Sequence, residues 1–84
     1  MMPNSMQTLS AAEAITEIRS LTSRGTRILG VDGFVSTPEG LIARLDLVLD
    51  VSGDDVTIVE AAEKAEAFVR SNVRPNIVFE ICAD

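Results

Sequence analysis

The fold is decided by the run Leu41-Ile42-Ala43-Arg44-Leu45-Asp46-Leu47-Val48-Leu49-Asp50-Val51, in which every odd position is apolar. The charged residues Arg44, Asp46 and Asp50 all occupy even positions. A period of two places such alternating residues on opposite faces of a β-strand. We therefore expect the odd residues to face a core and the even residues to face outward from a sheet. This outward face, which carries carboxylates, is the first place to look for function.

The segment before this strand completes a β-hairpin. Residues 27–35 are rich in β-branched residues, and the two glycines within them indicate a bulge or the close approach of another element. Between this segment and residues 41–51, Pro38 has a fixed φ and Gly40 is free to take a positive φ. Two strand-like segments around a short turn predict an antiparallel pair.

Two capping boxes predict where helices begin. A hydroxyl and a carboxylate stand three residues apart in Ser10-Ala11-Ala12-Glu13 and in Thr57-Ile58-Val59-Glu60. Each side chain can accept a hydrogen bond from the backbone amide of the other residue. Apolar residues at helical spacing follow each box. We predict helices over residues 11–24 and 58–71.

A third strand over residues 76–83 completes the order α-β-β-α-β, with alternating residues from Ile77 to Ala83 facing inward. The predicted fold class is α+β: a two-layer sandwich with a three-stranded sheet and two helices on one face. The second face of the sheet is then bare. We expect it to display some combination of Ile28, Asp32, Phe34, Ile42, Arg44, Asp46, Val48, Asp50, Val78, Glu80 and Cys82.

The length of 84 residues predicts one domain. Residues 1–8 are polar and aperiodic, which indicates a disordered leader, and residues 9–84 form the single α+β domain. Cys82 is the only cysteine and the chain has no histidine, which excludes an intramolecular disulfide framework and a zinc site of the Cys/His type.

The charge balance favours a basic partner. With 13 acidic and 7 basic side chains the net charge is −6, which disfavours nucleic acid and anionic membranes as ligands. Small soluble domains commonly carry such a charge for solubility alone. The first residues lack the features of a signal peptide and no run approaches the length of a membrane span, so we expect a cytoplasmic protein.

Catalytic and cofactor sites receive little support. Asp32, Asp46, Asp50 and Glu80 could converge to bind a divalent cation or to act in acid–base catalysis, and a small carboxylate-dependent metal enzyme stays open as an alternative. Carboxylates that keep a sheet face soluble explain the same residues. Cys82 has no histidine to deprotonate it, and no phosphate-binding glycine motif is present. We therefore expect no enzyme, no bound metal and no cofactor.

The bare sheet face remains as a protein-binding surface. Apolar residues would be desolvated at its centre, with Phe34 as the anchor, and carboxylates would steer a basic partner. An alternative is a homodimer that joins sheet faces or edges without another partner, and an idle face is also possible. The predicted partner-binding residues are Asp32, Phe34, Arg44, Asp46, Asp50 and Glu80.

Three segments carry a resemblance to a known group of proteins: Ile28-Leu29-Gly30-Val31-Asp32-Gly33-Phe34, Leu47-Val48-Leu49-Asp50-Val51-Ser52 and Val78-Phe79-Glu80-Ile81. From about residue 28 to residue 81 the chain resembles small bacterial immunity proteins of polymorphic toxin systems. The resemblance implies a single-domain cytoplasmic protein that binds and neutralises a cognate toxin and has no catalysis of its own. It also implies that Asp32, Phe34, Asp46, Asp50 and Glu80 are contact residues.

Overall fold

A computed structural model describes residues 8–53 and 55–84 and confirms the predicted α+β fold. The three strands form one open antiparallel sheet in the order β2-β1-β3. Except for Thr8, the predicted leader lies outside the described residues. In chain order the elements are α1 (Ala11–Ser23), β1 (Ile28–Thr37), β2 (Gly40–Asp50), α2 (Ile58–Ser71) and β3 (Ile77–Ala83).

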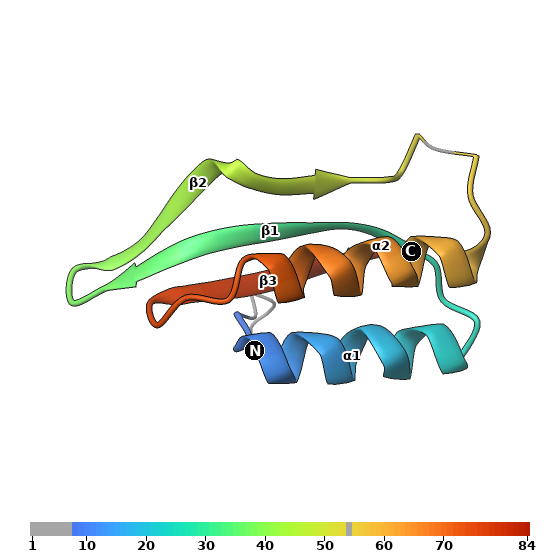
Figure 1. Cartoon of the computed structure of the whole chain (residues 1–84), viewed down its shortest axis with the longest axis horizontal. Coiled ribbons are helices and arrows are strands. Elements are labelled where there is room, and N and C mark those ends of the chain that lie inside the picture. The colour runs from blue at the N-terminus through green and yellow to red at the C-terminus, as the bar shows by residue number, and fades with distance from the viewer. Residues whose placement is uncertain (1–7, 54) are drawn as a thin grey trace, which may run out of the picture.

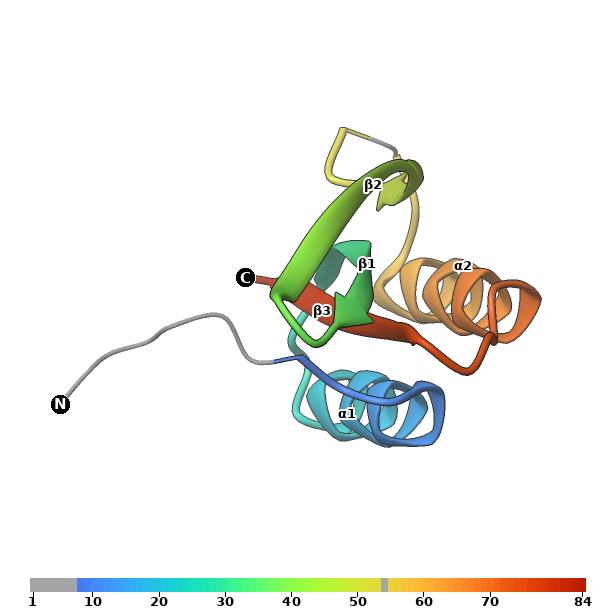
Figure 2. The same cartoon turned by 90° about the vertical axis from the view of Figure 1, so that its left-hand side faces the viewer.

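Both helices lie on the same side of the sheet, as the two views in Figure 1 and Figure 2 show. The two helices pack against each other, and of the strands α1 contacts mainly β3 and α2 contacts mainly β1. β2 forms the edge of the sheet that lies farthest from the helices, and Figure 1 shows it bent part-way along its length. The opposite side of the sheet, which the helices leave uncovered, is called the open face below.

Local hydrogen bonds begin both helices as predicted. In α1 the Ser10 hydroxyl accepts the Glu13 amide at 3.2 Å, and the Glu13 carboxylate accepts the Ser10 amide at 2.9 Å. Thr57 and Glu60 form the same pair of bonds in α2, at 3.0 Å and 2.8 Å. These bonds satisfy amides that have no partner within a helix. In the described part of the chain, neither helix is long and apolar enough to cross a membrane.

The core lies between the helices and β1 and β3. Small residues on the helices let them approach the sheet closely, and Phe79 at the centre of β3 is fully buried. The ring of Phe68 on α2 meets the Phe79 ring edge to face, with centroids 6.4 Å apart. The buried core cluster consists of Ala14, Ile18, Ile28, Val31, Val51, Ala61, Ala62, Ala65, Val69 and Phe79.

A bulge at the start of β1 corrects the predicted position of Ile28. Ile28 pairs with Ala83, but Gly30 pairs with Cys82, so β1 holds one extra residue at this point. One extra residue inverts the alternation of faces. Ile28 therefore faces the helices and is fully buried, although the sequence pattern assigned it to the outward face.

A larger irregularity in β2 corrects the faces that the alternating pattern of residues 41–51 predicts. Phe34 pairs with Ala43 and Asp32 pairs with Val48, so four residues of β2 lie opposite Gly33 alone. Between these two pairs, β1 advances by an even number of residues, from Asp32 to Phe34, while β2 covers an odd number, from Ala43 to Val48. Successive residues of a strand point to opposite faces, so even positions face outward in one half of β2 and odd positions face outward in the other.

This inversion divides the apolar residues of β2 between two environments. Val51 after the second half and Leu47 just before that half are buried as the pattern predicts. Leu41 in the first half and Leu45 between the two halves are exposed, although both stand at odd positions. The expectation that all odd positions face the core is therefore wrong for the first half. We call residues 44–47 the β2 bulge.

Candidate functional site: the open face of the sheet

Cross-strand pairing defines the rows of side chains on the open face, because residues paired across a sheet share a face. One row crosses all three strands at Asp32 and brings the two carboxylates of Asp32 and Glu80 beside each other. The rows are Asp50–Gly30–Cys82, Val48–Asp32–Glu80 and Ala43–Phe34–Val78. The face is therefore acidic near Asp32 and apolar near the hairpin.

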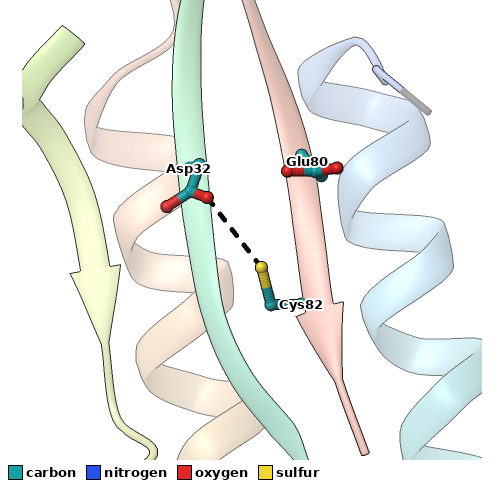
Figure 3. A group of neighbouring side chains, drawn as sticks. All are labelled: Asp32, Glu80 and Cys82. Atoms are coloured by element: carbon teal, nitrogen blue, oxygen red, sulfur yellow. Dashed lines mark hydrogen bonds between the residues drawn. The ribbon is translucent and has the colours of Figure 1, made fainter. Parts of the chain in front are cut away.

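Asp32, Glu80 and Cys82 form the tightest polar group on this face (Figure 3). The Cys82 thiol donates a hydrogen bond to Oδ2 of Asp32 at 3.9 Å. One potential ligand atom from each of the three residues lies within 4.8 Å of the others, and all three side chains are partly buried. The geometry suits either a small divalent cation or the cationic end of a partner side chain.

The acidic surroundings also determine the state of the thiol. Burial raises the pKa of Cys82, and the negative charges of Asp32 and Glu80 raise it further. A thiol with a raised pKa stays protonated at neutral pH and is a poor nucleophile. A metal ion bound through Cys82 would have to displace this proton, whereas a lysine or arginine of a partner protein needs only the carboxylates.

A shallow hollow of about 300 Å³ lies beside this group on the open face. Gly30 contributes no side chain to it, and Asp32 and Asp50 contribute carboxylates. Asp50 accepts hydrogen bonds from the Ser52 amide at 2.9 Å and from the Ser52 hydroxyl at 2.6 Å, and these bonds lower the pKa of Asp50. The hollow is lined by Leu29, Gly30, Asp32, Val48, Leu49, Asp50, Ser52 and Cys82.

Arg44 and Asp46 do not join the acidic group. Their side chains form a two-bond ion pair, at 3.0 Å and 2.9 Å, which lowers the pKa of Asp46. The pair lines a separate hollow of about 220 Å³ together with Asn72 and Arg74, which follow α2. Arg44 and Asp46 are therefore separated from the other predicted binding residues. The reason is that the β2 bulge inverts the faces of the strand between Ala43 and Val48.

Phe34 lies on the open face but is only 9% exposed, so it has little surface to offer as an anchor. Leu45 in the β2 bulge is 93% exposed, although its odd position predicted burial. The sequence signal for this exposure was Gly33, whose missing side chain leaves room for Leu47. Alternation alone could not show where the bulge would place each residue.

Comparisons with protein-family models, curated proteins and solved structures found nothing that matches this chain.

Proposed function

We propose that this protein is a non-enzymatic, cytoplasmic binding domain of the immunity type, which neutralises a basic protein toxin by covering it with the open face. The observation that carries the proposal is a concentration of negative charge on the uncovered side of the sheet. Asp32, Asp50 and Glu80 all lie on this side, on three different strands.

The ion pairs of Arg19, Arg44 and Arg70 do not involve the carboxylates of the open face. Arg19 and Arg70 pair with Glu66, and Arg44 pairs with Asp46. Carboxylates gathered on one surface attract cationic groups from outside. A basic protein would supply lysine and arginine side chains to them.

Apolar surface beside the carboxylates adds the second component of a protein interface. Val48 is 49% exposed and stands in the same row as Asp32 and Glu80, and it also lines the hollow at Gly30. An arginine or lysine could place its aliphatic stem on this surface and its charged end between the carboxylates. Apolar burial then contributes affinity, while the charges contribute association rate and register.

The toxin in this proposal comes from the resemblance of residues 28–81 to immunity proteins, and the net charge of −6 agrees with a basic partner. The cytoplasmic location in this proposal comes from the same resemblance.

The proposal is tested by affinity capture from a lysate of the source organism, with the wild-type protein and a D32N/D50N/E80Q variant as baits. We expect the wild type to retain one basic protein in stoichiometric amount at low salt. The variant should associate at least about tenfold more slowly, and the difference should shrink in high salt because exposed charges are screened. The captured protein should be toxic when expressed alone, and co-expression with the wild-type protein should remove its toxicity.

An E39Q/D55N/E63Q variant is the matched control, because it removes the same charge from exposed positions away from the open face. It should capture the partner as the wild type does. Equal loss of capture in both variants would show that net charge alone acts, and this result would refute the open face as the binding site. A captured protein that shows no toxicity would refute the immunity role but keep the binding surface.

A further inference from the structure

The outer edge of β2 is the sheet edge that the described part of the chain leaves uncovered. At the other edge, Leu9 forms an antiparallel bridge with Phe79 of β3, with reciprocal backbone bonds of 2.7 Å and 2.8 Å. No described residue pairs with β2 on the side away from β1. A sheet edge with free backbone groups is a template for another strand.

β2 also carries most of the exposed apolar surface. Six large hydrophobic side chains are exposed among the described residues, and four of these belong to β2. The most exposed is Leu45, at 93%. The other three on this strand are Leu41, Ile42 and Val48. Pairing with Ser36 and Asp32 places Leu41 and Val48 on the open face, and pairing with Val35 places Ile42 on the opposite face. β2 therefore offers apolar contacts along its edge from both faces of the sheet.

The type of residue that the β2 bulge exposes indicates whether the edge of β2 is protected from pairing with another strand or favours it. Proteins prevent edge pairing in several ways, among them bulges, charged side chains (lysine above all) and proline on the edge strand. Here the bulge presents Leu45, and β2 contains neither lysine nor proline. Continuous exposure of this leucine is unfavourable unless another apolar surface covers it.

The charges on either side of Leu45 indicate which partner fits. Arg44 and Asp46 stand two residues apart with opposite charge, so this segment is neutral and does not favour a basic protein. In an antiparallel pair centred on Leu45, each Arg44 lies opposite the Asp46 of a second copy. Each Arg44 then exchanges the Asp46 of its own copy, to which it donates two hydrogen bonds, for the Asp46 of the second copy. The segment is therefore complementary in charge to itself under a twofold axis.

We propose that a second copy of this chain docks antiparallel on the outer edge of β2, with the two Leu45 side chains in contact and Arg44 and Asp46 paired reciprocally between the copies. This interface is separate from the acidic residues of the open face, so it does not depend on the proposed function. Contact through one bent strand buries less than a standard interface, and we expect a weak dimer with a Kd on the order of 100 µM.

Sedimentation equilibrium on the full chain, from about 10 µM to about 1 mM, tests the proposal with charge-reversal variants. R44D and D46R should each weaken self-association by roughly tenfold or more, because each places like charges opposite one another. The double variant R44D/D46R should restore it, because the opposite-charge pairs return with their positions exchanged. An equimolar mixture of R44D with D46R should form a mixed dimer for the same reason.

L45D should abolish the dimer, and E63K, an exposed charge reversal on α2, should leave it unchanged. Circular dichroism of every variant would show that the fold is retained. D32N/D50N/E80Q should dimerise as the wild type does, which separates this proposal from the acidic binding site. A wild-type protein that stays monomeric at about 1 mM, or a dimer that R44D and L45D leave intact, would overturn the proposal. A monomer whose capture of a basic partner is lost with L45D would overturn it as well, and would assign Leu45 to that partner.

Discussion

Substitution of Gly33 by alanine tests the β2 bulge more directly than any other change. A Cβ atom at Gly33 would lie 2.7 Å from Cβ of Leu47 and 3.2 Å from both its Cδ1 and its backbone oxygen. The shortest of these distances is roughly 0.8 Å less than that at which two carbon atoms pack best. Since Cβ of Leu47 is attached directly to the backbone, the bulge itself has to move.

The cost follows from overpacking of a tightly filled site, which typically destabilises a protein by about 1–3 kcal/mol. We expect Gly33→Ala to lower the free energy of unfolding by about 2 kcal/mol and Tm by about 8–16 °C. Urea denaturation followed by circular dichroism measures the first quantity, and a thermal scan measures the second. Gly53→Ala is the control, because a Cβ atom there has nothing within 4 Å, and it should stay within about 0.5 kcal/mol of the wild type.

The same clash predicts how a second substitution changes the cost. Leu47→Ala removes Cδ1 but keeps Cβ, so Gly33→Ala should remain costly in that background. Leu47→Gly removes both atoms, so the additional cost of Gly33→Ala should largely disappear there, as a double-mutant cycle would show. If Gly33→Ala were no more destabilising than Gly53→Ala, four residues of β2 could not lie opposite Gly33 as described.

Three further predictions concern the register, the thiol and acid stability. Ile28→Ala should cost about 2–5 kcal/mol in urea denaturation, while Ile42→Ala, at a 53% exposed position, should cost less than about 1 kcal/mol; equal losses would contradict the bulge at the start of β1. Because burial, Asp32 and Glu80 raise the pKa of Cys82, iodoacetamide should alkylate this thiol more slowly at pH 8 than it alkylates a free cysteine, and Asp32→Asn should accelerate the reaction by up to about tenfold; no acceleration would disprove the influence of Asp32. Hydrogen bonds from the α2 N-cap lower the pKa of Glu60 below its ordinary value of 4.5. The contribution of Glu60 to stability is therefore present above that pH and is lost as the pH falls through the folded-state pKa. The drop in the urea midpoint from pH 7 to pH 3 should be larger for the wild type than for Glu60→Gln, and equal drops would contradict this linkage.

Much of the fold could be predicted because the signals are local. A capping box joins residues three positions apart, as Ser10 and Glu13 do, and needs no contact with the rest of the chain. Strand periodicity and turn residues act over similarly short distances, and Gly40 takes the positive φ of 132° that its place in the hairpin turn allows. The order of the elements and the antiparallel hairpin followed from these signals.

The candidate site was predicted only in part. Asp32, Asp50 and Glu80 do lie on the open face, because they stand in stretches where strand pairing is regular. Arg44 and Asp46 lie elsewhere, Phe34 is nearly covered, and Leu45 is exposed. Each of these differences involves a residue in the β2 bulge or one paired beside it.

The sequence by itself determined which segments become helices and strands and that the sheet carries a surplus of carboxylates, because propensity, caps and charge belong to the residues alone. The tertiary structure decided which side of the sheet each strand residue faces. One extra residue in β1 between Ile28 and Gly30, or a four-residue bulge in β2 opposite Gly33, inverts that side. Both depend on how two strands pair rather than on either strand's own pattern.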